Sequence, residues 1–341
     1  MRVERAVCGL LAIGLGVGLW LLYGGAGAAP QAAEVPSTGL PQNPLRNGEH
    51  APPADGPTKA LVKAADSGHD STNKPATGGT APEVVGSLAS PIVPTTGDAP
   101  TVEAAVGQHP LDACLAVAKK VLTHLRKDVK DYTCVVVKQE RIAGTLNQPV
   151  YMACKIRQQP FSVYMKFVKP DDVKDREVLY VTSANDGNLL AREGSGIKRA
   201  FGMVSLKPTG LLAMEGQRYP ITELGLNRLV EKLIEIGERD RKYGECEVHF
   251  YKNARVNDRV CTLIEVVHPT PRRNFLFYKA RIYIDDQLNV PIHYEAQLWP
   301  KQPGGEAVLD EAFTYLQLKL NPGLSDADFD FHNPTYHFVG K

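Results

Sequence analysis

Aromatic residues are missing from a long stretch near the start of the chain. No Phe, Trp or Tyr occurs between Tyr23 and Tyr132, and 12 of the 25 prolines lie between Pro30 and Pro100. Such a stretch cannot bury enough apolar surface to offset the chain entropy that folding removes. We therefore expect residues 30–106 to form a disordered linker rich in Pro, Gly and Ala. Residues 107–341 are long enough for a single domain with its own core.

An excess of charge of one sign is also missing. The 39 Lys and Arg residues nearly balance the 38 Asp and Glu residues, which gives a formal net charge of +1. Domains that bind nucleic acid usually carry a basic excess. We therefore expect no nucleic-acid partner.

Common catalytic and metal-binding motifs are absent. The sequence has no Gly-x-Ser-x-Gly, no His-Glu-x-x-His and no phosphate-binding loop. Asp285 and Asp286 fall at a tight turn between strands, where Asp is favoured for backbone reasons. Asp326, Asp328 and Asp330 resemble half of a calcium loop, but its glycine and distal glutamate are missing. Ser325 with Asp328 looks more like the cap of a helical turn. Three histidines in or beside predicted strands are interpreted as ordinary sheet residues: His249, His268 and His293. We expect no enzymatic activity, no cofactor and no metal.

The first 29 residues have the layout of an export signal. Arg2 and Arg5 precede an apolar stretch from Ala6 to Tyr23, and the small residues Ala26 and Ala28 follow. This order predicts a secretory signal peptide. The alternative is an uncleaved anchor, because about 18 apolar residues just suffice to span a bilayer. Both interpretations place the rest of the chain outside the cytoplasm, in the periplasm or cell envelope, in the second case tethered through residues 6–23.

Five cysteines follow the signal: Cys114, Cys134, Cys154, Cys246 and Cys261. An oxidising compartment permits disulfides, but an odd number leaves at least one cysteine unpaired within the chain. If the strands on either side of Gly144 form a hairpin, Cys134 and Cys154 lie near each other. We predict this pair as the candidate disulfide. No Cys-x-x-Cys or Cys/His cluster supports a structural zinc site.

The apolar pattern beyond residue 107 predicts an α+β fold. Helical spacing predicts helices over Leu111–Lys127 and Leu224–Arg239. Alternation with a period of two predicts about ten strands, which tend to curl into a half-open antiparallel β-barrel. We expect the helices on one side of this large curved sheet. The aromatic-rich end, Leu324–Phe338, is expected to plug one end of the sheet.

The strand that follows Pro160 carries large apolar side chains at alternate positions. Its alternate residues point to one face, which covers either a core alone or a ligand as well. The connection Ser195–Thr222 is long and has apolar residues of its own, so it forms either a flap over the sheet or an irregular segment packed on the core. We predict a ligand site on the apolar face from six residues: Phe161, Val163, Met165, Phe167, Met214 and Ile282.

Several runs of the sequence resemble a family of exported bacterial proteins of unknown function, planctomycete in type. These runs lie between His109 and Phe338 and include DYTCVVVKQERIAG, YMACKIRQQPFSVYMKFVKP, PTGLLAMEGQRYPITELG and LKLNPGLSDADFDFHNPTYHF. The layout is also remotely similar to the lipoprotein carrier fold of LolA and LolB, in which a half-open barrel holds acyl chains beneath helices. The unit from Ile282 to Tyr294 is part of this likeness. The resemblance implies a lipid or a lipidated protein as the ligand.

Two functions of different classes follow. The first is an extracytoplasmic, non-catalytic binding protein that holds a lipid, an acyl group or a lipoprotein on the concave apolar face of the sheet. The second is a membrane-tethered sensor or interaction domain of the envelope that binds a partner protein and no lipid. The long linker is a departure from the carrier layout, because a tethered domain cannot carry a ligand far.

Overall fold

The computed structural model describes residues 94–101, 108–243 and 245–339. They belong to one compact unit. The predicted signal and nearly all of the predicted linker lie outside these residues. Within them, no helix is both long and apolar enough to cross a membrane.

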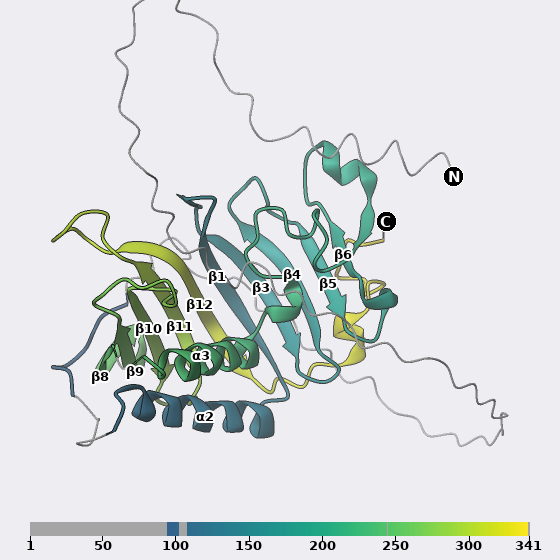
Figure 1. Cartoon of the computed structure of the whole chain (residues 1–341). Coiled ribbons are helices and arrows are strands. Elements are labelled where there is room, and N and C mark those ends of the chain that lie inside the picture. Colours follow the sequence, from purple (N-terminus) through teal and green to yellow (C-terminus); the bar gives the residue numbers. More distant parts are fainter. Residues whose placement is uncertain (1–93, 102–107, 244, 340–341) are drawn as a thin grey trace, which may run out of the picture. The chain divides into compact units, whose positions relative to one another are not determined.

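Twelve strands form one open antiparallel sheet (Figure 1). Its order from one edge to the other is β7 (Met203–Leu206), β6 (Leu189–Arg192), β5 (Glu177–Val181), β4 (Ser162–Lys169), β3 (Val150–Arg157), β1 (Asp131–Ile142), β12 (Val308–Leu320), β11 (Pro291–Leu298), β10 (Lys279–Asp285), β9 (Arg259–Val267) and β8 (Glu247–Val256). The short β2 (Thr145–Leu146) pairs with β1. The predicted α+β class and the large open sheet are confirmed.

Two helices, α2 (Leu111–Asp128) and α3 (Leu226–Asp240), lie side by side over one face of the sheet (Figure 1). Their exposed sides are joined by three ion pairs: Lys119–Glu238, Arg126–Glu231 and Arg241–Asp112. They approach closely at Gly237, where a Cβ atom would lie 2.9 Å from Cδ2 of Leu115. The links between the helices are therefore partly electrostatic, whereas their sheet-facing stripes are apolar.

The register of β1, β3 and β4 decides which residues face the helices. Cys134 lies opposite Cys154, and Cys154 lies opposite Met165. Side chains opposite each other in register point to the same face. The alternate residues of β4, Val163, Met165 and Phe167, therefore face the main core beneath the helices.

The C-terminal segment covers the other face of the sheet, over β4 to β6. Its aromatic residues form a second core with alternate residues of these strands. The ring of Tyr336 stacks on that of Tyr164 with 3.8 Å between centroids. Asp328 accepts a hydrogen bond from the buried Lys155 at 2.7 Å. The expectation that Leu324–Phe338 plugs one end of the sheet is wrong, because the segment lies on a face of the sheet. Tyr164 makes this second face of β4 apolar, and the segment buries it.

The predicted flap divides into two parts. Its first part contains a short 3-10 helix, Ile197–Phe201, and then β7, which extends the sheet beyond β6. Its second part returns across the helix-bearing face towards α3. There Arg218 donates to Asp310 at 2.8 Å and the Tyr219 hydroxyl donates to Glu311 at 2.8 Å. Both acceptors belong to β12, so this part of the connection is fixed to the middle of the sheet.

Candidate ligand cavity between the helices and the sheet

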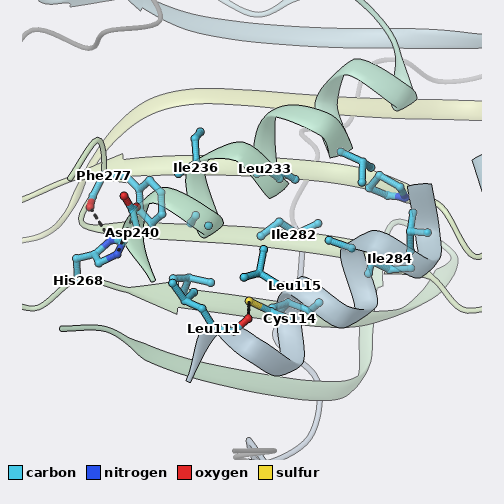
Figure 2. Close-up of a pocket in the computed structure, with 18 residues that line it drawn as sticks. Leu111, Cys114, Leu115, Leu233, Ile236, Asp240, His268, Phe277, Ile282 and Ile284 are labelled. Atoms are coloured by element: carbon cyan, nitrogen blue, oxygen red, sulfur yellow. Dashed lines mark hydrogen bonds and ion pairs between the residues drawn. The ribbon is translucent and has the colours of Figure 1, made fainter. Parts of the chain in front are cut away.

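A cavity of about 70 Å³ lies between the two helices and strands β9 and β10 (Figure 2). The helices contribute residues spaced three or four apart, which places them on one side of each helix. These are Leu111, Cys114, Leu115, Ala118 and Val121 of α2, and Val230, Leu233, Ile236, Gly237 and Asp240 of α3. The sheet and its connections contribute Ile264, Val266, His268, Phe277, Ala280, Ile282, Ile284 and Pro291.

One end of this apolar cavity is polar. Asp240 is the last residue of α3, and His268 follows the end of β9. Their side chains point towards each other (Figure 2), with 3.6 Å between Oδ2 of Asp240 and Nε2 of His268. Both residues are almost fully buried, and neither of these two atoms has a hydrogen-bond partner among the described residues. Two buried acceptors without a donor are unusual, because such atoms lose their bonds to water.

The protonation of this pair follows from its surroundings. Burial lowers the pKa of His268 to about 4, so its ring is neutral at neutral pH. Nδ1 lies 3.3 Å from the carbonyl oxygen of Phe277. Because a carbonyl can only accept, Nδ1 carries the proton and Nε2 presents a lone pair to the cavity. Burial raises the pKa of Asp240, against the lowering effect of the neighbouring Arg239.

The pair can receive hydrogen bonds from a bound molecule. When Asp240 is ionised, Oδ2 and Nε2 are both acceptors. A hydroxyl, an amide or an amine that lies beside both atoms donates to one or to both. The rest of the wall offers only apolar contact. The site therefore suits a molecule with an apolar body and a hydrogen-bond donor at one end.

The cavity is small for such a molecule in this conformation. An engineered apolar cavity of about 150 Å³ holds one benzene ring, and the space here is about 70 Å³. A long hydrocarbon chain fits only if the helices move away from the sheet. The apolar contacts that hold the helices to the sheet lack directional preference, and the ion pairs between α2 and α3 can persist while the two helices move together.

The six predicted ligand residues are not gathered at this cavity. Ile282 of β10 lines it. Val163, Met165 and Phe167 face the same side of the sheet but belong to the main core, and Phe161 packs at its margin. Met214 is half-buried in the connection that follows β7. Whether the β4 residues contact a ligand stays a prediction.

Two residues of the cavity were missed from the sequence. The sequence pattern predicts an ordinary sheet residue at His268, and no motif points to Asp240. A signal for Asp240 was present, since it lies seven residues after Leu233 and four after Ile236, on the apolar stripe of its helix. A carboxylate at such a position is informative because burial of an unpaired charge is costly.

The five cysteines that the structure describes are free thiols. Cys134 and Cys154 lie directly opposite each other, so the predicted proximity is confirmed, but the structure has no disulfide between them. Cys114 lines the cavity, and burial raises the pKa of its thiol to about 12. Its sulfur donates to the carbonyl of Leu111 at 3.1 Å. A thiol in this state is a poor nucleophile.

Several solved structures are similar to this chain at low sequence identity and low TM-score. LppX, a lipoprotein of Mycobacterium tuberculosis, is 10% identical with a TM-score of 0.36, over 64% of this chain and 100% of its own. A putative outer membrane lipoprotein-sorting protein domain of Vibrio parahaemolyticus is 13% identical with a TM-score of 0.31, over 63% and 95%. A LolA superfamily protein of Nitrosomonas europaea is 11% identical with a TM-score of 0.26, over 63% and 96%. At these TM-scores the likeness carries no argument about a ligand or a partner.

A family comparison gives the relationship by sequence. No curated protein matches the chain. Residues 129–338 match the family described as "Protein of unknown function (DUF1571)". This range falls within His109–Phe338, the stretch whose sequence resembles exported bacterial proteins of unknown function. Because the match covers more than half of the chain, this protein belongs to the DUF1571 family.

Proposed function

We propose that this protein is an extracytoplasmic, non-catalytic binding protein that holds an acyl chain between its two helices and the sheet. The observation that carries the proposal is the cavity itself. Apart from Asp240 and His268 its wall is apolar, and these two residues present unpaired acceptors at one end. An acyl chain with a hydroxyl or an amide near its head matches both features.

The predicted apolar face of β4 gives the bound acyl chain a direction in which to extend. The core around the cavity and the main core share four residues that pack against both: Val117, Leu229, Ile234 and Ile284. Apolar side chains are thus continuous beneath the helices from β10 to β4. When the helices move outward, a chain that begins between Asp240 and His268 can follow this path towards Met165 and Phe167.

The groups at the cavity support binding and do not support acyl transfer. Such transfer needs a nucleophile next to a base. The thiol of Cys114 stays protonated at neutral pH, because burial raises its pKa to about 12. His268 presents an acceptor nitrogen, but its neighbour across 3.6 Å is the carboxylate of Asp240 and no hydroxyl.

The location outside the cytoplasm rests on the predicted signal in residues 1–29. The proposed ligand suits that location, because acyl chains and lipidated proteins occur in the cell envelope. The alternative function, a tethered domain that binds a partner protein and no lipid, predicts an empty cavity. The two functions are therefore separated by whether the purified protein carries a lipid.

Native mass spectrometry of the full chain, purified from an exporting host, tests the proposal. We expect a bound mass of lipid size, lost on extraction with organic solvent. Ala118→Leu fills the cavity and is expected to lower lipid occupancy. Ala116→Leu on the same helix is the matched control, because Ala116 is exposed. A protein that is empty and takes up no lipid on incubation refutes the proposal and favours the partner-binding function.

A second variant, Phe161→Asp, tests how far the bound acyl chain extends. If the chain reaches β4, this substitution shortens the preferred acyl length and leaves head-group recognition intact. If lipid occupancy and acyl length match those of the wild type, the predicted contact with Phe161 is wrong, while the cavity remains the site.

A further inference from the structure

Among the residues that the structure describes, the large exposed apolar side chains are concentrated in one segment, residues 195–214. Six of the nine large exposed hydrophobic residues among those described lie here: Ile197, Phe201, Met203, Val204, Leu211 and Leu212. Ile197 is 87% exposed and Leu211 is 93% exposed. A scattered exposed Leu needs no explanation, but clustered apolar residues mark a contact surface.

The charges of this segment are of one sign. It contains Lys and Arg residues but no Asp or Glu, although the whole chain is nearly neutral. Arg199 and Lys207 are exposed, and Arg192 of β6 lies opposite Met203 of β7. Within the described part of the chain, none of these three cations forms an ion pair. Arg192 lies opposite the buried Glu177 of β5, whereas the exposed Arg199 and Lys207 are free to meet anionic groups.

Strand β7 of this segment lies at an edge of the sheet. β7 pairs with β6 on one side and has no partner on the other among the described residues. In Figure 1 this edge lies beyond β6, at the opposite end of the sheet from β8. The short 3-10 helix that carries Ile197 and Phe201 has a glycine with positive φ at each end, Gly196 and Gly202. These two turns present the apolar side chains outward.

We propose that residues 195–214 insert into the surface of an anionic lipid bilayer. Apolar side chains at the level of the head groups and cations beside lipid phosphates are the two contributions that hold proteins at a membrane surface. A purely apolar partner surface would leave the cations unpaired. A second copy of this chain would place the cations of two identical segments near each other. The bilayer is the occupant that satisfies both features, and the proposal does not depend on the ligand of the cavity.

Co-sedimentation of the full chain with vesicles of phosphatidylglycerol and phosphatidylcholine tests the proposal. The variant Ile197→Asp/Leu211→Asp is expected to bind at least about tenfold more weakly, because it puts two charges at the apolar contact. Val339→Asp is the matched control, since Val339 is also exposed but lies outside the segment. Vesicles of phosphatidylcholine alone should bind the wild type more weakly, and the difference should shrink at high salt. The N-terminal residues are common to all variants, so differences report on the segment.

A second measurement reads the position of the segment directly. Phe201→Trp places an indole in the 3-10 helix, and brominated lipids quench indoles that enter the bilayer. Quenching of Phe201→Trp above that of the wild type, whose tryptophans remain as background, is expected. If quenching is equal and the double Asp variant binds vesicles like the wild type, the proposal is overturned. Self-association that the double variant abolishes, without vesicle binding by the wild type, also overturns it and assigns the surface to a second copy.

Discussion

Asp328 offers the sharpest test of how the far face of the sheet is held. Its carboxylate accepts a hydrogen bond from Lys155 at 2.7 Å, and the side chains are only 3% and 4% exposed. The same carboxylate accepts from the backbone N–H of Ser325 at 2.8 Å. Asp328→Ala leaves a buried ammonium without a partner, which costs about 3–5 kcal/mol. For a domain of this size that loss lowers Tm by about 10 °C.

The neighbouring Asp326 provides the control. It pairs with Arg157 at 2.6 Å but is 95% exposed, so water already solvates it. Asp326→Ala should cost less than about 1 kcal/mol. Urea denaturation of both variants measures the difference. Lys155→Met added to Asp328→Ala should recover most of the loss, because it removes the unpaired charge. Equal stability of the two single variants would show that the buried pair does not hold the C-terminal segment.

The stabilisation by Asp328 also has a defined pH dependence. Burial raises the pKa of this carboxyl, but the hydrogen bonds from Lys155 and Ser325 outweigh it, so the pKa is lowered from 3.8. A lowered carboxyl pKa contributes stability above the unfolded value and loses it as the pH falls through the folded value. The difference in stability between the wild type and Asp328→Ala should therefore be constant near neutral pH and shrink below about pH 4.

Three further predictions concern the helices and the connection to them. Gly225→Ala should destabilise the protein by more than about 1 kcal/mol. Gly225 has φ of +113°, and a Cβ atom there would lie 2.8 Å from the Tyr132 hydroxyl. Thermal unfolding measures the loss, and a variant as stable as the wild type would refute the prediction. Between pH 6.5 and about 4, His268 is protonated in the unfolded chain but stays neutral in the folded one. The free energy of unfolding therefore decreases as the pH is lowered through this range. His268→Gln should flatten that part of the urea-measured curve, and an unchanged slope would contradict the assignment. Arg218→Met removes the cation beside Asp310 and should speed limited proteolysis of the connection before α3, whereas an unchanged cleavage rate would show that the pair does not fix it.

The helices and most strands could be predicted because their patterns are long. The first helix was expected over Leu111–Lys127 and ends one residue later, at Asp128. The second was expected from Leu224 and begins at Leu226, after Gly225. The difference there has a physical cause, because the N–H of Leu226 donates to the hydroxyl of Tyr132 at 2.9 Å and thereby fixes the helix start. Such a contact joins residues far apart in the sequence, and periodicity does not contain it.

The position of the cavity could not be predicted from periodicity. An apolar stripe tells which side of a helix is buried but not where two stripes leave a gap above a sheet. The strand that carries most of the predicted ligand residues, β4, is packed well enough that Val163 is fully buried. The gap lies instead over Ala280 of β10, where the sheet has a small side chain, next to Gly237 of α3. The cap formed by Ser325 and Asp328 was predicted correctly, since its spacing is local.

The pairing of β1 with β12 has a consequence for how the chain reaches this fold. Every other neighbouring pair in the sheet joins strands that are close in sequence. These pairs form two meanders, β1 to β7 after helix α2 and β8 to β12 after helix α3. Hairpins form quickly from local contacts, whereas a pairing between distant strands requires closure of a long loop and is slow. We therefore expect the two meanders to form before the β1–β12 pairing joins them. During that interval two long strands destined for the middle of the sheet present unpaired edges, and this is the stage at which the folding chain is most prone to self-association.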